Sequence, residues 1–503
     1  MELKSTPGGT ETGGARPTII QGGMGVGVSH WRLARAVAQA GQLGVVSGTA
    51  LDTVLARRLQ LGDLDGDMRR AIANFPFPAV SERVLAAHFI RNGKLGGEPF
   101  HPLPMISHRP GVAAIELLVL ANFVEVWLAK EGHTGRVGIN YLHKVQMPTL
   151  PSLYGALLAG VDYVLMGAGI PMTIPGILDQ LSRGEAVRLK LEVEEALPDE
   201  VHQVTFDPAE FCGGPPPRLR RPQFVAIIAS SVLALTLARK ANGCVDGFVV
   251  EGSSAGGHNA PPRGGGELSE RGEPVYGLRD VPDLEKIRAL GVPFWLAGGY
   301  ATAARLTEAL AAGAAGVQVG TAFAWCDESG IAPQLKSEAL RAARAGTAEV
   351  FTDPAASPTG FPFKVLSLTD TLSEPEVYSS RPRICDLGYL RRPYRRTDGT
   401  LGFRCPGEPV DHYLAKGGKL ADTVGRKCLC NGLTATVGLG QTQAAGYVEP
   451  ALVTTGDDVT GIIRFLAPGR DSYSAADVIR CLLGEAPQPS GDSQRAPAYG
   501  TFA

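Results

Sequence analysis

The sequence predicts an α/β fold: a (β/α)8 TIM barrel with an insertion after its second strand and a C-terminal extension. Eight short apolar runs each end in a Gly-rich or polar turn, and most are followed by a helix-like segment. Continuous apolar strands that alternate with helices are typical of a parallel sheet buried on both faces. Eight such units favour a closed barrel, and an open doubly wound sheet is the alternative.

The eight predicted strands follow one another in chain order, with helix signals between them. The first is "PTIIQGGMG", after which "HWRLARAVAQAG" places apolar residues at helical spacing. Helices that precede a strand repeatedly end in Gly, in "AQAG", "LLAG", "RALG" and "LAAG", which is a common stop signal. The predicted strands lie at Pro17–Gly25 and near Val45, Ile139, Val164, Ile227, Val249, Leu296 and Val319.

Two stretches are too long for a single strand–helix unit and are predicted to be insertions, at about 52–136 and 181–222. From about residue 350 the alternation gives way to segments that contain aromatic residues, Pro and Cys. We therefore expect a C-terminal extension packed on the barrel. The predicted organisation is a flexible N-terminus (1–16), the barrel (17–349), the extension (350–486) and a flexible tail (487–503).

The composition argues against several classes of protein. The net charge is −2 and 19% of the residues are charged, so no basic face for nucleic acid is expected. No run approaches the roughly 18 apolar residues of a membrane span, and the polar N-terminus lacks the apolar stretch of a signal peptide. Eight Cys in 503 residues do not suggest a disulfide scaffold. We expect a cytoplasmic protein that binds neither nucleic acid nor a membrane, and a homodimer is left open.

The chemistry is expected at the C-terminal ends of the strands, where the reactive groups of such barrels collect. The seventh strand ends in "AGGY", with Gly298 and Gly299, and the eighth in "VGTAF", with Gly320 and Thr321. Small residues let backbone N–H groups approach an anion closely. A phosphate held by these two loops is a recurring arrangement in barrels.

The first strand ends in "QGGMG", where Gly22 and Gly23 would let a planar ring lie over the backbone. Met24 beside them is either part of this site or an ordinary core residue. Asn140, at the end of "GIN", offers an amide that can donate and accept hydrogen bonds toward a ring edge. The alternative is that Asn140 merely closes the strand.

The sixth strand opens into "EGSSAGGHNAP", which holds a single imidazole, His258. Imidazole titrates near neutral pH and can therefore serve as a base for a carbon acid or as an acid beside a ring. A lone His is more often structural. Gly256 and Gly257 before it and the Asn-Ala-Pro-Pro turn after it favour a functional role.

These motifs, taken together over roughly Pro17 to Glu349, resemble the nitronate monooxygenase family, formerly the 2-nitropropane dioxygenases, whose relatives include FMN-dependent enoyl-ACP reductases. The resemblance implies FMN as the cofactor. It also implies that His258 is the catalytic histidine, which removes the acidic proton of a nitroalkane or assists nitronate oxidation. The cofactor-binding residues that it implies are Gly22, Gly23, Met24, Asn140, Glu251, Gly256, Gly257, Gly298, Gly299, Gly320 and Thr321.

Three functions remain open at this stage. The first is the oxidation of nitroalkanes or nitronates with O2. The second is an NAD(P)H-dependent FMN reductase of enoyl thioesters or quinones, in polyketide, fatty-acid or other secondary metabolism. The third is a flavin-binding partner without activity in an assembly. No second G-x-G-x-x-G follows a strand, so a separate Rossmann site for a pyridine nucleotide is not predicted.

The extension also contains four cysteines in "RICDLGY", "FRCPGEP" and "RKCLCNG". Four thiols can close a tetrahedral zinc site or hold an iron–sulfur cluster. The alternative is a set of free, partly buried thiols, because none of the spacings is the familiar two-residue pair. The candidate metal ligands are Cys385, Cys405, Cys428 and Cys430.

Overall fold

The computed structural model describes residues 16–443 and 446–485, and its centre is a sheet of eight parallel strands. Their order is β1-β10-β9-β8-β7-β4-β3-β2. Backbone hydrogen bonds from Gln21 to Leu43 (3.0 Å) and from Leu43 to Ile19 (3.1 Å) join the first strand to the segment that leads into the second. The sheet is thereby closed, and the predicted (β/α)8 barrel is confirmed. The predicted flexible ends, 1–16 and 487–503, lie outside the described residues apart from Arg16.

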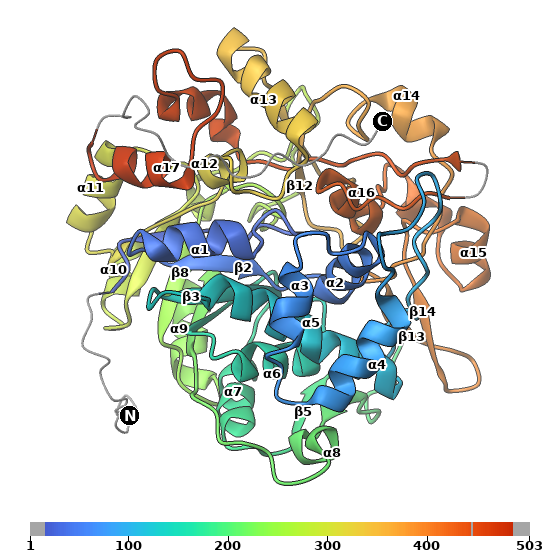
Figure 1. Cartoon of the computed structure of the whole chain (residues 1–503). Helices are drawn as coiled ribbons and strands as arrows, with labels where there is room; N and C mark the ends of the chain where they lie inside the picture. Colours follow the sequence, from blue (N-terminus) through green and yellow to red (C-terminus); the bar gives the residue numbers. More distant parts are fainter. Residues whose placement is uncertain (1–15, 444–445, 486–503) are drawn as a thin grey trace.

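All eight predicted runs form the barrel strands. They are β1 (Ile19–Gln21), β2 (Gly44–Ser47), β3 (Val137–Leu142), β4 (Tyr163–Gly167), β7 (Gln223–Ile228), β8 (Gly247–Glu251), β9 (Phe294–Ala297) and β10 (Gly316–Val319). The helices between these strands include α1 (Trp31–Gln39), α6 (Thr149–Leu158), α7 (Ile174–Ser182), α9 (Ser231–Lys240), η1 (Leu278–Asp280), α10 (Leu284–Arg288) and α11 (Ala303–Ala311) (Figure 1). Helices α12 (Thr321–Ala324) and α13 (Pro333–Ala345) follow β10.

The barrel core has two parts because strand side chains alternate between the two faces of a sheet. Inside the barrel, Ile20, Val45, Leu165 and Val249 pack together with Trp295. The opposite faces of the same strands pack against the surrounding helices in a larger cluster. The strands are therefore buried on both sides, as their continuous apolar character predicted.

The two long stretches between strands hold additional elements. Between β2 and β3 lie α2 (Leu51–Gln60), α3 (Asp67–Ile72), α4 (Pro78–His88) and α5 (Val112–Lys130). Between β4 and β7 lie the antiparallel pair β5 (Val187–Lys190) and β6 (Gln203–Phe206), and then α8 (Pro208–Cys212).

Helix α5 differs from the expectation that no segment approaches a membrane span. By length and composition it is apolar enough to cross a membrane, but 72% of its apolar stretch is buried in the protein. Its polar side chains are satisfied there: Glu125 accepts from the Trp31 backbone N–H at 2.8 Å, and Asn122 accepts from the Tyr141 hydroxyl at 2.8 Å. Such pairing is what buried polar groups require. The helix is therefore a core helix of the fold.

The residues beyond the barrel form β11 (Val350–Asp353), β12 (Phe363–Leu366), α14 (Pro375–Ser380), β13 (Arg392–Arg395), β14 (Leu401–Arg404), α15 (Val410–Ala415), η2 (Leu420–Thr423), α16 (Leu429–Thr436), η4 (Asp457–Phe465) and α17 (Ala475–Leu482). In Figure 1 these orange to red elements occupy the upper and right parts of the view. Helix η4 packs against α12 and α13, and α17 packs against α1 and α11.

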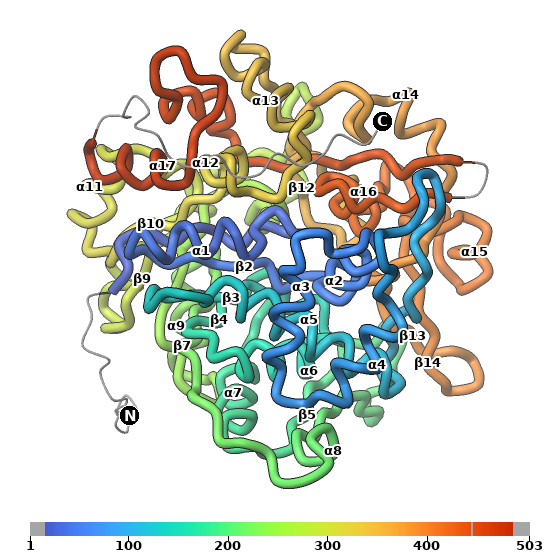
Figure 2. The backbone as a smooth tube through the Cα atoms, in the orientation of Figure 1, coloured from blue at the N-terminus to red at the C-terminus, as the bar shows by residue number. Residues whose placement is uncertain are grey.

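The first insertion and the extension also contact each other. The Arg391 guanidinium donates to the Ile106 carbonyl oxygen at 2.9 Å, and the rings of His108 and Phe403 lie 6.0 Å apart. Figure 2 shows the blue stretch after α4 running beside the orange β13–β14 pair. The extension is thus fixed to the barrel both directly and through this insertion.

Candidate functional site

A cavity of about 240 Å³ lies at the C-terminal ends of the barrel strands. Every predicted flavin-site residue lines it, including His258 in the loop that follows β8. These residues are Gly22, Gly23, Met24, Asn140, Glu251, Gly256, Gly257, His258, Gly298, Gly299, Gly320 and Thr321. The structure therefore brings together all twelve positions, which come from five different strand ends.

At the end of β1, Gly23 is required by its close approach to β3. A Cβ atom at Gly23 would lie 2.3 Å from the Cβ atom of Asn140, which is far below any normal contact. The Asn140 Nδ2 group donates to the Gly23 carbonyl oxygen at 3.0 Å. This bond fixes the amide, so that Oδ1 is the atom left without a partner.

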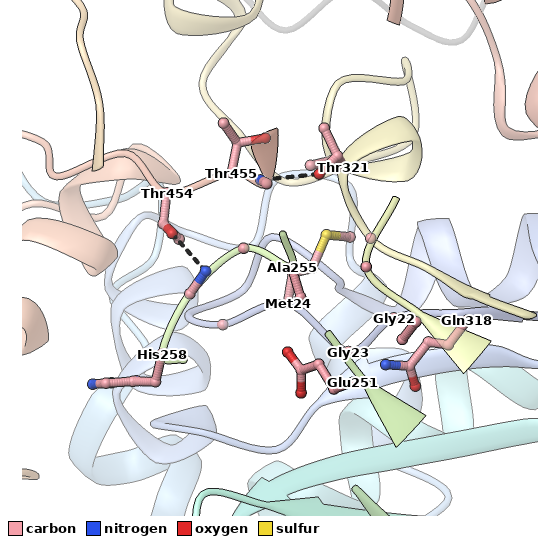
Figure 3. Close-up of a pocket in the computed structure, with 18 of the residues that line it drawn as sticks. Gly22, Gly23, Met24, Glu251, Ala255, His258, Gln318, Thr321, Thr454 and Thr455 are labelled. Atoms are coloured by element: carbon pink, nitrogen blue, oxygen red, sulfur yellow. Dashed lines mark hydrogen bonds between the residues drawn. The ribbon is translucent and has the colours of Figure 1, made fainter. Parts of the chain in front are cut away.

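Two buried oxygens lack hydrogen-bond partners at this cavity: Asn140 Oδ1 and Gln318 Oε1. Buried polar atoms are nearly always paired in folded proteins, so each of these acceptors is expected to receive a hydrogen bond from a ligand or from water. Gln318 lies beside Gly22 in Figure 3. An acceptor at this position suits a flat, polar ring with an N–H group at its edge, and these residues are therefore compatible with the isoalloxazine ring of FMN.

The two predicted phosphate loops have the backbone that such a site needs. Gly298 (φ 88°) and Gly299 (φ 76°) adopt left-handed conformations that favour glycine. A Cβ atom at Gly320 would project toward Met24, 3.6 Å from its Sδ atom. The Thr321 hydroxyl accepts from the Gly456 N–H at 3.0 Å, a contact with the extension. Helix α12, which follows the second loop, has only four residues.

The His258 ring is directed away from Met24, Glu251 and Gln318 and toward the extension (Figure 3). Its Nε2 atom lies 2.7 Å from the Ser357 hydroxyl, and its ring centroid lies 4.8 Å from that of Phe363. Burial, helped by the charge of Lys144, holds the pKa of His258 well below its usual value. The imidazole is therefore neutral at pH 7 and able to accept a proton.

Glu251 at the end of β8 is the second ionisable group of the cavity. Burial raises the pKa of its carboxyl group to about 7. Glu251 and His258 also line a second cavity of about 270 Å³, together with Ala168, Ile227 and Tyr276 among others. The two ionisable side chains thus stand at the boundary between the two cavities.

The sequence analysis missed the residues that the extension contributes. Thr454, Thr455, Asp458 and Phe363 line the first cavity, and Ser357 holds His258. No spacing signal links them to the barrel motifs, because they lie 99 or more positions from His258 in the sequence. Gln318 also lines the cavity but was not predicted as a site residue, although it belongs to a motif that the sequence analysis used. Its inward position on β10 could have identified it.

The predicted metal site is not supported. Within residues 16–443 and 446–485, no group of three or more His, Cys, Asp or Glu side chains is arranged to hold a metal ion. All four candidate ligands are free thiols. Burial raises the pKa of Cys428 to about 12 and also raises those of Cys385, Cys405 and Cys430. The four cysteines nevertheless lie near one another, because Cys385, Cys405 and Cys428 all contribute to the raised pKa of Cys430.

Comparison with known proteins supports the motif analysis. Residues 185–355 match the family model described as nitronate monooxygenase. A probable nitronate monooxygenase of Bacillus subtilis (strain 168) is 39% identical over 104 residues, which are 20% of this chain and 28% of that relative. The chain thus matches less than a third of the relative's length.

Solved structures with a similar course of the chain have low identity. The enoyl reductase domain of MlnA from the macrolactin biosynthesis cluster of Bacillus amyloliquefaciens has a TM-score of 0.46 at 12% identity, with 93% of each chain covered. The nitroalkane oxidase from Streptomyces ansochromogenes has a TM-score of 0.42 at 19% identity, covering 93% of this chain and 95% of that one. The family match over 185–355 confirms the resemblance that the motifs indicated: in its barrel, this chain is similar to the nitronate monooxygenase family.

Proposed function

We propose that the chain is an FMN-dependent oxidoreductase of the nitronate monooxygenase type, which oxidises nitroalkanes or nitronates with O2. The observation that carries the proposal is a single cavity with two unpaired acceptors, glycine-rich strand ends and a neutral histidine. The family match over 185–355 supports it. The cytoplasmic location and the homodimer stay predictions.

Three groups of residues would hold the cofactor. Gly298, Gly299, Gly320 and Thr321 would hold its phosphate, and Asn140 and Gln318 would accept hydrogen bonds from its ring. The backbone at Gly22, Gly23 and Met24 would border the ring, as would Glu251, Gly256 and Gly257 on the other side. When bound, FMN would supply the redox chemistry that connects oxidation of the substrate with reduction of O2.

His258 would act as the base for a neutral nitroalkane. Its lowered pKa keeps it unprotonated, so it can take the proton from the carbon next to the nitro group. The Nε2 atom is engaged by Ser357, and no described residue is hydrogen-bonded to Nδ1. Nδ1 is therefore the nitrogen available to a substrate.

A second candidate function is favoured by the second cavity. The space beyond Glu251 and His258 measures about 270 Å³, more than a small nitroalkane needs. Such a space would suit a longer substrate, such as the enoyl thioester of an NAD(P)H-dependent reductase. In that reaction the neutral carboxyl group of Glu251 would be a proton donor below about pH 7.

Anaerobic reduction of the bound flavin separates the two functions. The purified holoenzyme is mixed with NADPH or with propionate 3-nitronate, and the loss of flavin absorbance is followed by stopped flow. The proposed function predicts bleaching by the nitronate. Rapid bleaching by NADPH with no response to the nitronate would overturn it in favour of the reductase.

A further inference from the structure

The loop that carries His258 is held against the extension, so the histidine has a fixed environment. Phe363 pairs with His258 in a short antiparallel bridge, with hydrogen bonds from Lys364 N to Gly257 O (3.0 Å) and from Asn259 N to Pro362 O (2.9 Å). His258 lines both cavities, so ligands bound there would restrict the access of water to the ring. The Nε2 side, at Ser357, is then the remaining route for a proton.

An unbroken line of hydrogen bonds leads away from Nε2. The Ser357 hydroxyl lies 2.7 Å from His258 Nε2 and 2.7 Å from the Thr359 hydroxyl. The Lys144 ammonium group donates to the Thr359 hydroxyl at 3.2 Å. Ser357 is fully buried, whereas Lys144, in the loop between β3 and α6, is partly exposed. The line therefore runs from the cavity toward the surface.

Lys144 is suited to exchange protons near neutral pH. Burial, with the charge of Arg392, lowers the pKa of its amine to about 7. The amine also lies 4.4 Å from the ring centroid of Phe361, which covers one side of it. Two guanidinium groups also face this line: Arg392 donates to the Thr359 carbonyl oxygen, and Arg426 donates to the Ser357 carbonyl oxygen at 2.6 Å. Glu251 lines the same two cavities as His258. An ordinary surface lysine would stay protonated at pH 7 and could not accept a proton.

We propose that Ser357, Thr359 and Lys144 form a proton-conducting line that connects His258 with the surface. The proposal rests on the proposed function, in which His258 exchanges a proton with the substrate. The protonated ring gives its Nε2 proton to Ser357 Oγ, Ser357 passes its own hydroxyl proton to Thr359 Oγ1, and Thr359 passes its own to the neutral Lys144 amine. Lys144 releases that proton to water, and a reductase would use the same line in reverse.

Matched substitutions in the holoenzyme test this line. Lys144→Met, Lys144→Arg and Thr359→Val are each expected to lower kcat about tenfold or more, with the flavin content unchanged. Lys144→Arg keeps the positive charge, but its guanidinium group cannot give up a proton. A lowered kcat in this variant would therefore exclude a purely electrostatic role for Lys144. Thr359→Ser restores the hydroxyl and should restore the rate. Lys190→Met, at an exposed lysine on β5, is the control.

Chemical rescue adds a readout that a structural role would not produce. Added ethylamine is expected to return part of the lost rate to Lys144→Ala and none to Thr359→Val, because only the first variant lacks an amine while its hydroxyls remain. Wild-type rates for Lys144→Met, Lys144→Arg and Thr359→Val would overturn the proposal.

A measurement on the flavin-free protein separates this proposal from the proposed function. His258 ring signals are assigned by NMR as those missing from His258→Asn, and they are titrated in the wild type and in Lys144→Met. Loss of the Lys144 charge is expected to raise the pKa of His258 by about half a unit or more. An unchanged pKa would overturn the coupling of the two residues. Failure to oxidise any nitronate, with the pKa shift present, would overturn the proposed function alone.

Discussion

The cavity has two walls of different origin. The barrel wall is made of strand ends and presents mainly backbone, with glycines at five of its closest approaches: Gly22, Gly23, Gly298, Gly299 and Gly320. The wall from the extension presents side chains, among them Thr454, Thr455 and Phe363. The difference suggests a division of labour, in which the backbone wall holds a cofactor and the side-chain wall adapts the site to its substrate.

Hydrogen bonds and close backbone packing join the two walls at the loop that carries His258. The Gly257 N–H donates to the Thr454 hydroxyl at 2.9 Å, and the Gly456 N–H donates to the Thr321 hydroxyl at 3.0 Å (Figure 3). A Cβ atom at Gly256 would lie 2.7 Å from the backbone of Thr455. The substitutions below act on one wall or on the junction, in order of decreasing expected effect.

On the barrel wall, Gly23→Ala is expected to abolish FMN binding. The new Cβ atom would collide with Asn140, whose own Cβ atom is fixed to a buried strand, so the end of β1 must move away from the ring site. Flavin content after purification measures the effect. Gly214→Ala, where a Cβ atom meets nothing within 4 Å, is the control and should keep its flavin. Full flavin content in Gly23→Ala would show that this wall does not hold the cofactor.

At the junction, His258→Asn is expected to leave FMN bound but to slow the turnover of a neutral nitroalkane by roughly 10²–10⁴-fold. The preformed nitronate should be affected less, because no carbon-bound proton then has to be removed. Steady-state rates with both substrates give the comparison. Equal, unchanged rates would assign His258 a structural role.

Glu251→Gln tests the ionisation state of the barrel wall. The folded protein raises the pKa of this carboxyl group from 4.5 to about 7. Its contribution to stability is therefore present below pH 4.5 and is lost as the pH rises to about 7. The free energy of unfolding of the variant should exceed that of the wild type by up to about 3 kcal/mol at pH 8 and should differ little from it at pH 4.5. Urea unfolding of the flavin-free wild type and variant at both pH values measures this effect. If the variant and the wild type differed by the same free energy at both pH values, the raised pKa of Glu251 would be contradicted.

The smallest effect is expected for Thr454→Val, which removes one hydrogen bond between the walls. The Gly257 N–H loses its acceptor, which costs about 1–3 kcal/mol where the group stays buried. Because Gly257 precedes His258, kcat should fall more than flavin content does. Thr236→Val, on an exposed face of α9, is the control. A variant with normal kcat but lost flavin would mean that Thr454 belongs to the cofactor wall.

The barrel wall was predictable from sequence because its signals are local. Each glycine-rich turn directly follows an apolar run, and the ends of parallel strands in a barrel necessarily meet. The other wall was not predictable, because Ser357 and Thr454 reach the site only through the packing of the extension, which no local pattern encodes. The cysteine spacing was equally uninformative: within the described residues no group of three or more His, Cys, Asp or Glu side chains is arranged to hold a metal ion, which favours the alternative of free thiols.

The central claim is that the strand ends of this barrel form a site for FMN. Its most direct test is a titration of the purified, flavin-free protein with FMN, followed by the quenching of flavin fluorescence. We expect saturable binding at one FMN per chain, lost in Gly23→Ala and kept in Gly214→Ala. A wild-type protein that remains colourless and leaves the fluorescence of added FMN unchanged would contradict the claim.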